Sequence, residues 1–276
     1  MKDCSDERCR EVATDIRRRC IRMTFKGKSG HLGSMLSMAE LTSVLYMRTL
    51  RVDPANPAWP ERDRFILSKG HAGAAVFAAL AIRGFFPPER MERYYLDDGM
   101  SGHISHHVPG VELSTGSLGH GLPVATGMAL AAKMDGKKHR VFCLMSDGDC
   151  NEGSTWEAIM FAAQHHLDNL TVIVDYNRVQ ALGKMEDICE MEPFTDKLTM
   201  FGWETRTIDG HSIPQITETL AEVPLASGKP SWILARTVKG KGVRRLENTV
   251  ASHYGNCFAS EAEMEAGIRE VEGNKS

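Results

Sequence analysis

The chain has 276 residues, of which 42% are hydrophobic, and a formal net charge of −3, so it can bury a large core and gives no indication of binding nucleic acid or an anionic membrane. Its seven cysteines are odd in number and form no Cys-x-x-Cys pair, which predicts neither a disulfide framework nor a zinc site and fits a reducing cytoplasm. The charged N-terminal segment and the shortness of every apolar run predict no secretory signal and no membrane span.

The first predicted element is an amphipathic helix over residues 6–23, whose apolar side chains recur at helical spacing. The arginine run 17–19 falls largely on its opposite face, where charged side chains are more often solvated than engaged with a phosphate. A small polar loop, residues 28–34, follows the helix. It contains His31, which could be presented to a ligand, although a single histidine in a loop more often has a structural part.

The next segments predict a helix, a strand and a second helix. Ser37 and Glu40 have the spacing of a capping box, and the apolar residues behind them predict a helix with one buried face. After a proline-rich connection, residues 65–67 predict a short buried strand. His71 marks the carboxyl end of that strand, just before an alanine-rich helix over residues 72–82.

Residues 98–121 are rich in glycine and histidine. Several histidines in one loop can indicate a zinc site, but here their spacing is irregular and their cysteine and carboxylate partners are poorly arranged for zinc. We therefore do not expect zinc. A helix of small residues, 122–134, follows this loop.

The stretch 141–183 predicts a βαβ unit, with an acidic-glycine turn after its first strand and an amide after its second. The carboxyl ends of parallel strands meet at one edge of the sheet, so Asp147 and Asn177 should lie close together. Their oxygens suit Mg²⁺, which usually completes its shell with phosphate oxygens and water, and Gly148 has no Cβ to hinder a phosphate. The unit thus predicts a magnesium and diphosphate clamp, and the alternative is an ordinary βαβ unit with a polar turn.

Downstream, His211 lies in a predicted turn before a helix over residues 214–220, where we expect it to have a structural part. Residues 232–235 predict another buried strand. Lys239 and Lys241 follow that strand in a glycine turn that could face an anion. The order of elements predicts an α/β fold with a mostly parallel sheet flanked by helices.

Five stretches resemble motifs of the transketolase family, in the family's order and within about residues 10–270. The thiamine diphosphate motif of that family opens with Gly-Asp-Gly and closes with Asn-Asn, and here it reads Ser146-Asp147-Gly148 and Tyr176-Asn177. Tyr254 interrupts the family's last His-Gly pair. The other stretches are Ser-Gly-His-x-Gly at 29–33, Asp-Arg-Phe-x-Leu-Ser-x-Gly-His at 63–71, the glycine-rich loop 110–119 and Ser-His at 252–253.

The resemblance implies roles for individual residues. The histidines expected to take part in catalysis are His31, His71, His103 and His253, and the neighbours His106 and His107 are alternatives to His103. The residues expected to bind the cofactor are His71, Gly116, Leu118, Asp147, Gly148, Asn177 and His253. The expected ligands of Mg²⁺ are the side chains of Asp147 and Asn177 and the main-chain oxygen of Val179.

The resemblance also implies a three-layer thiamine diphosphate-binding fold, with a single diphosphate-binding domain over residues 1–276, and the function of the N-terminal subunit of a split transketolase. With thiamine diphosphate and Mg²⁺, such a protein would help transfer a two-carbon ketol unit from a ketose, expected to be phosphorylated, to an aldose. Full-length transketolases have a further domain that binds the pyrimidine ring. We therefore expect a C-terminal partner subunit in a heterotetramer with two copies of each, a cytoplasmic location and almost no activity from this chain alone.

Two alternatives remain at this point. The chain could be a subunit of another thiamine diphosphate enzyme, such as the E1 component of a 2-oxo acid dehydrogenase, but the Ser-Gly-His and Leu-Ser-x-Gly-His loops argue against it. It could also be a non-catalytic paralogue that stabilises a partner. The presence of Asp147, Asn177 and His71 argues against that possibility.

Overall fold

A parallel sheet forms the centre of the computed structural model, which describes residues 4–273. Its strand order is β1-β2-β3-β5-β4, and each neighbouring pair is parallel. All carboxyl ends therefore meet at the same edge of the sheet. The strands are β1 (Arg64–Leu67), β2 (Val141–Ser146), β3 (Leu170–Tyr176), β4 (Glu204–Asp209) and β5 (Ser231–Arg236).

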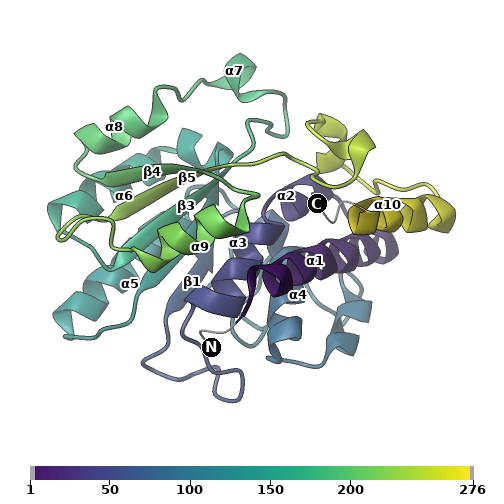
Figure 1. Cartoon of the computed structure of the whole chain (residues 1–276), viewed down its shortest axis with the longest axis horizontal. Coiled ribbons are helices and arrows are strands. Elements are labelled where there is room, and N and C mark those ends of the chain that lie inside the picture. The colour runs from purple at the N-terminus through teal and green to yellow at the C-terminus, as the bar shows by residue number, and fades with distance from the viewer. Residues whose placement is uncertain (1–3, 274–276) are drawn as a thin grey trace.

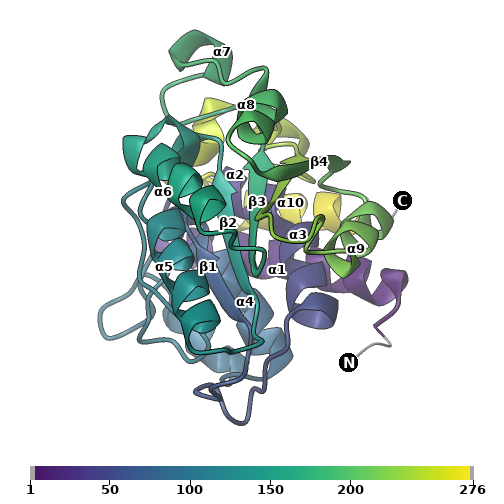
Figure 2. The same cartoon turned by 90° about the vertical axis from the view of Figure 1, so that its left-hand side faces the viewer.

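Helices cover both faces of this sheet, as Figures 1 and 2 show. Alternate side chains of the strands enter separate cores on the two sides, so that Phe142 and Leu144 face one core while Cys143 and Met145 face the other. One side is covered by α1 (Asp6–Gly27), α2 (Leu32–Ser37), α3 (Ala39–Val44), α4 (Gly73–Arg83), α9 (Ile213–Ala221) and α10 (Glu261–Gly273). The other is covered by α5 (Gly121–Met134), α6 (Gly153–Gln164) and α8 (Phe194–Met200).

Short helical turns complete the described chain. They are η1 (Leu45–Thr49), η2 (Gly70–Ala72), η3 (Pro88–Arg93), η4 (Gly148–Asn151), α7 (Met185–Ile188), η5 (Arg244–Leu246) and η6 (Val250–His253). Within residues 4–273, no helix combines the length and the apolar character needed to cross a membrane. The three-layer α/β architecture predicted from the sequence is confirmed.

The predicted start of a helix at Ser37 is wrong. Ser37 instead ends α2, and α3 begins at Ala39 after a break in the helix. The Ser37 hydroxyl donates a hydrogen bond to Oδ2 of Asp175 at 2.5 Å, far along the sequence, and therefore does not cap a helix. The capping-box spacing is a local pattern, and it cannot predict that the Ser37 hydroxyl bonds a residue distant in the sequence instead.

The expectation of a solvated arginine run on α1 is wrong for Arg17. Its guanidinium is buried and makes two hydrogen bonds of 2.6 Å to the carboxylate of Glu40, while its Nε donates to the main-chain oxygen of Leu36. Arg18 and Arg19 do remain partly exposed. The reason is that α10 and α3 pack against α1 and cover part of the face that would otherwise be solvated.

Candidate functional site

The predicted site residues lie where neighbouring strands end. His71 follows β1, Asp147 follows β2 and Asn177 follows β3. Because the strands are parallel and adjacent, these residues lie at one edge of the sheet, the edge where open α/β sheets bind ligands. Only short connections separate each residue from its strand, so the sheet fixes their positions.

A tight turn joins the three residues predicted to bind a metal. Asp147 Oδ2 accepts a hydrogen bond from the main-chain N–H of Arg178 at 2.6 Å, and Asn177 Oδ1 accepts one from Val179 at 3.1 Å. Arg178 has a left-handed φ of 61°, which allows the chain to reverse here. Asp147 Oδ1 accepts from Gly148 at 2.9 Å, so both carboxylate oxygens are oriented and each has another lone pair.

The donor set of this turn fits Mg²⁺. It offers one carboxylate, one amide oxygen and one main-chain oxygen, all of them hard ligands. Within the described residues there is no group of three or more His, Cys, Asp or Glu side chains placed to hold a metal ion. A site of the predicted kind does not need such a group, because magnesium usually takes few protein ligands and completes its shell with phosphate and water.

Buried charges surround the turn. Burial, with a contribution from nearby Asp175, raises the pKa of Asp147 to about 6, although hydrogen bonds from the main chain oppose the shift. Burial lowers the pKa of Lys239 to about 8. The Lys239 ammonium donates to the main-chain oxygen of Val179 at 2.7 Å. Burial thus disfavours the charged forms of both Asp147 and Lys239. A bound cation would stabilise the Asp147 carboxylate and a bound anion would stabilise the Lys239 ammonium, as expected of a binding site.

A second buried ion pair lies beneath the edge. Lys69 and Asp175 are paired with both side chains 0% exposed, and Lys69 also donates to the main-chain oxygen of Ser34 at 3.0 Å. Asn177 Nδ2 lies 3.4 Å from Asp175 Oδ2 and so couples this pair to the metal turn. No role was assigned to Lys69 or Asp175 from the sequence, although each lies two positions before a selected residue, His71 or Asn177.

Four histidines from separate loops converge beside this edge. The ring centroid of His31 lies 5.1 Å from that of His71, 5.5 Å from His103 and 4.7 Å from His253. His71 and His253 are 5.6 Å apart. His31 has a left-handed φ of 69°. Its main-chain N–H donates to the main-chain oxygen of His253 at 2.9 Å. The four histidines predicted to be catalytic thus form one cluster.

The environment keeps these imidazoles uncharged. Burial lowers the pKa of His31 and of His253 to about 4, with smaller contributions from neighbouring histidines and Lys239. It lowers the pKa of His71 well below its ordinary value and also lowers that of His103. Nδ1 of His253 is buried with no hydrogen-bond partner in the described part of the chain, which is the kind of atom that a bound ligand satisfies.

The loop that carries His103 extends from the histidine cluster to the metal turn. A Cβ at Gly116 would lie 3.1 Å from Cδ2 of His103, and one at Gly148 would lie 3.3 Å from Cδ1 of Leu118. The predicted cofactor-binding residues Gly116 and Leu118 are thus in close contact with both parts of the site.

The two alternatives to His103 lie in the same loop but make other contacts. The rings of His106 and His107 are exposed and lie with their centroids 4.1 Å apart at a tilt of 41°, and His106 Nδ1 lies 2.7 Å from Ser114 Oγ. The ring contacts with His31 come from His103 instead.

One residue that sequence reasoning left without a role organises the loops of the site. Asp149 Oδ1 accepts hydrogen bonds from Ser68 Oγ at 2.6 Å and from the main chain of Gly119 at 2.9 Å. Its Oδ2 accepts two bonds of 2.8 Å from Ser146. Asp149 therefore joins the ends of β1 and β2 to the glycine-rich loop, and its position in the acidic turn was the one available signal.

Fold and site together define an α/β cofactor-binding domain, in which acidic, amide, lysine and imidazole groups meet at the carboxyl edge of a parallel sheet. Residues 9–270 match the family model described as "Transketolase, thiamine diphosphate binding domain". The chain belongs to the transketolase family, whose members are transferases, and represents its thiamine diphosphate-binding domain.

Relatives with known names are similar over most of this chain. A 6-deoxy-6-sulfo-D-fructose transketolase subunit SqwG from Clostridium sp. (strain MSTE9) is 42% identical over 245 residues, which are 88% of either chain. One of the subunits of an apulose-4-phosphate transketolase from Phocaeicola vulgatus is 38% identical over 256 residues, covering 92% of this chain and 90% of that one. Both relatives are named as subunits and have a length similar to that of this chain.

Solved transketolases have the same fold. The enzyme from Campylobacter jejuni superposes with a TM-score of 0.88 at 32% identity, over 96% of this chain and 42% of that one. The enzyme from Leishmania mexicana superposes with a TM-score of 0.89 at 28% identity, over 96% and 41%. The chain thus spans about two fifths of the length of these solved transketolases.

Proposed function

We propose that this chain is the N-terminal subunit of a two-subunit transketolase that transfers a two-carbon ketol unit from a ketose to an aldose, with thiamine diphosphate and Mg²⁺. The observation that carries the proposal is the convergence of four uncharged histidines beside the turn that joins Asp147 and Asn177. Proton transfer and phosphate binding both have suitable groups there. The names of the related subunits support the same interpretation.

The metal would be held by the side chains of Asp147 and Asn177 and by the main-chain oxygen of Val179, in exchange for the Lys239 ammonium that now bonds that oxygen. Gly148 leaves room for a phosphate beside the turn. Lys239 is buried and cationic at the same place, so we assign it a contact with the diphosphate. Leu118, Gly116 and the imidazoles of His71 and His253 would complete the cofactor contacts.

When bound, thiamine diphosphate supplies a nucleophilic carbon and an electron sink for breaking the bond next to the ketose carbonyl. The chain contributes the groups that surround that chemistry. An uncharged imidazole offers one donor and one acceptor, so His31, His71, His103 and His253 can exchange protons with substrate hydroxyls and hydrogen-bond a developing oxyanion. His71 is buried, whereas the other three histidines are partly exposed and can be reached by a substrate.

Two further parts of the proposal concern the substrate and the partner. The donor we propose is a ketose with a terminal anionic group, because one relative is named for a sulfonated fructose and another for apulose 4-phosphate. The partner we propose is a C-terminal subunit with the pyrimidine-binding domain, in a heterotetramer of two copies each. All seven cysteines are free, which supports a reducing, cytoplasmic setting.

The test is ketol transfer by this chain alone and after co-purification with the partner subunit. Fructose 6-phosphate, 6-deoxy-6-sulfo-D-fructose and apulose 4-phosphate serve as donors, and the uncharged sugar fructose is the matched control. We expect activity from the complex with at least one anionic donor, little with fructose, and almost none from the chain alone. Full activity from the chain alone would refute the two-subunit proposal, and equal rates with fructose would refute the anionic donor.

A further inference from the structure

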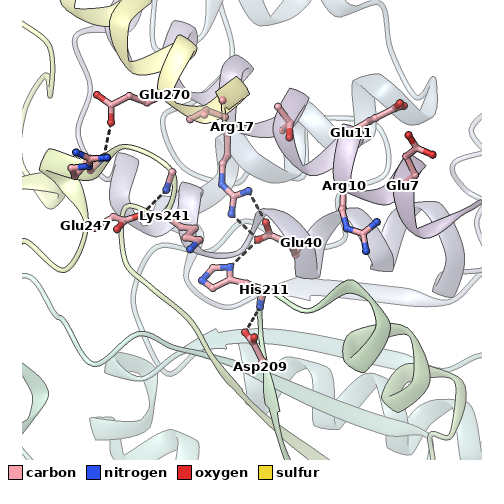
Figure 3. Close-up of a pocket in the computed structure, with 15 residues that line it drawn as sticks. Glu7, Arg10, Glu11, Arg17, Glu40, Asp209, His211, Lys241, Glu247 and Glu270 are labelled. Atoms are coloured by element: carbon pink, nitrogen blue, oxygen red, sulfur yellow. Dashed lines mark hydrogen bonds and ion pairs between the residues drawn. The ribbon is translucent and has the colours of Figure 1, made fainter. Parts of the chain in front are cut away.

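A charged cleft of about 1110 Å³ is lined by residues of α1, α3 and α10, by the turn after β4 and by the segment 241–247 that follows β5 (Figure 3). Its base is formed by Arg17 and Glu40, and His211 lies against the same carboxylate. Sequence reasoning expected only a structural part for His211. The contacts of its ring connect this cleft to the proposed cofactor site.

The two ring nitrogens of His211 have different partners. Nδ1 lies 3.0 Å from Oε2 of Glu40, and Nε2 lies 2.9 Å from the main-chain nitrogen of Val238. A main-chain N–H can only donate, so Nε2 must accept and carries no proton. The carboxylate can only accept, so Nδ1 must carry the proton. These contacts define one neutral tautomer.

Glu40 is held ionised in this arrangement. Burial alone would raise its pKa, but Arg17, followed by the hydrogen bond from His211, outweighs burial and lowers the pKa to about 2. The main-chain N–H of His211 is fixed as well, since it donates to Oδ1 of Asp209 at 2.9 Å. The imidazole is therefore anchored at its backbone and at Nδ1, which leaves Nε2 directed at Val238.

Val238 lies directly before Lys239, just past the end of β5. The preceding residue still pairs with the sheet, since the N–H of Thr237 donates to the oxygen of Tyr176 at 3.2 Å. The N–H of Val238 has left the sheet and donates to the imidazole instead. The ring thus fixes the main chain at Val238, the residue before Lys239. The side chain of Lys239 extends from there toward Val179 and Asp147.

We propose that His211 is a positioning residue of the cofactor site, which holds Lys239 against the bound diphosphate through the main chain of Val238. The inference rests on the proposed contact of Lys239 with the diphosphate. A merely structural His211 would link α3 to the turn after β4 and would affect stability alone. A positioning His211 affects cofactor affinity, and only while Lys239 is present.

A double-mutant cycle separates these two roles. The co-purified complex is prepared as wild type, His211→Phe, Lys239→Met and the double variant, and the Kd of thiamine diphosphate is measured by calorimetry at saturating Mg²⁺. We expect each single variant to weaken binding about tenfold, the size of one lost hydrogen bond to a charged group. We expect the double variant to bind no more weakly than Lys239→Met.

The inference would be overturned if His211→Phe had the wild-type Kd, or if the fold-increases in Kd of the two single variants multiplied in the double variant. Either result would leave the role of Lys239 intact. An unchanged Kd for Lys239→Met would instead refute the proposed contact of Lys239, and the inference with it.

If His211→Phe does not fold, two other variants carry the test. His211→Gln retains an acceptor for Val238 and should keep the Kd within about threefold of wild type, whereas His211→Asn retains only a donor for Glu40 and should lose affinity about tenfold. Equal Kd values for these two variants would overturn the inference.

Discussion

Replacing Glu40 by glutamine tests the buried network beneath the charged cleft. The change preserves shape but removes the negative charge that pairs with Arg17 through two bonds of 2.6 Å. The pKa of Glu40 falls from its ordinary 4.5 to about 2. At about 1.36 kcal/mol per pKa unit, this difference corresponds to about 3 kcal/mol of preference for the ionised form in the folded state. The variant should unfold with a free energy about 3 kcal/mol below that of wild type at pH 7.

The sign of the pH dependence follows from the direction of that pKa. A carboxyl group with a lowered pKa contributes its full stability above pH 4.5, and the contribution is lost as the pH falls toward 2. Urea unfolding of both proteins between pH 6 and 3 should therefore show a difference that is constant above about pH 5.5 and shrinks below 4.5.

The matched control is Glu7→Gln, which changes an exposed carboxylate in the same cleft and should alter stability by less than about 0.5 kcal/mol. For Glu40→Gln at pH 7, the thermal midpoint should fall by roughly 6–12 °C. A difference between wild type and Glu40→Gln that stays the same down to pH 3, or no difference at pH 7, would refute the reasoning.

Three further substitutions test the site itself. In Asp147→Ala, Mg²⁺ and thiamine diphosphate should no longer raise the thermal midpoint of the complex, and an unchanged response would contradict the metal assignment. In Tyr254→Phe, loss of the 2.8 Å bond from the hydroxyl to the oxygen of Ala181 should speed hydrogen exchange at residues 181–183 about threefold with little change in the thermal midpoint, whereas equal exchange rates would show that the bond does not hold this loop. In Gly70→Ala, the new Cβ would overlap the main-chain oxygen of Thr115 and should lower the urea midpoint, while Gly153→Ala, with nothing within 4 Å, should be neutral or stabilising; equal midpoints would count against the close approach.

The parts of the fold that the sequence predicts well are those encoded by local pattern. Every residue of β2 and β3 is buried, because helices cover both faces of the sheet. Most of these residues are therefore apolar, and each strand is recognisable in the sequence as an apolar run. The prediction missed β4, because this strand lies at the edge and among its residues only Ile208 is buried. An edge strand with solvated side chains has no apolar run to reveal it.

The site divides in the same way. The rule that carboxyl ends of parallel strands share an edge was enough to bring Asp147 and Asn177 together, and the structure joins them through Arg178 and Val179. Contacts between side chains of distant elements follow no such rule. His211 meets a carboxylate 171 positions away, and nothing in the local sequence of either residue indicates the other. Local patterns place residues on elements, whereas packing decides which of their side chains meet.

The proposed site separates charge from proton transfer. Lys69 is neutralised by its partner Asp175, so Lys239 is left to supply positive charge at the metal turn. The imidazoles beside it have lowered pKa values, and His31 and His253, at about 4, remain neutral at pH 7. Protonated histidines there would repel Lys239 and compete for the same phosphate oxygens. Because they stay neutral, they keep both a donor and an acceptor for the substrate, and the positive charge stays at the diphosphate end of the site.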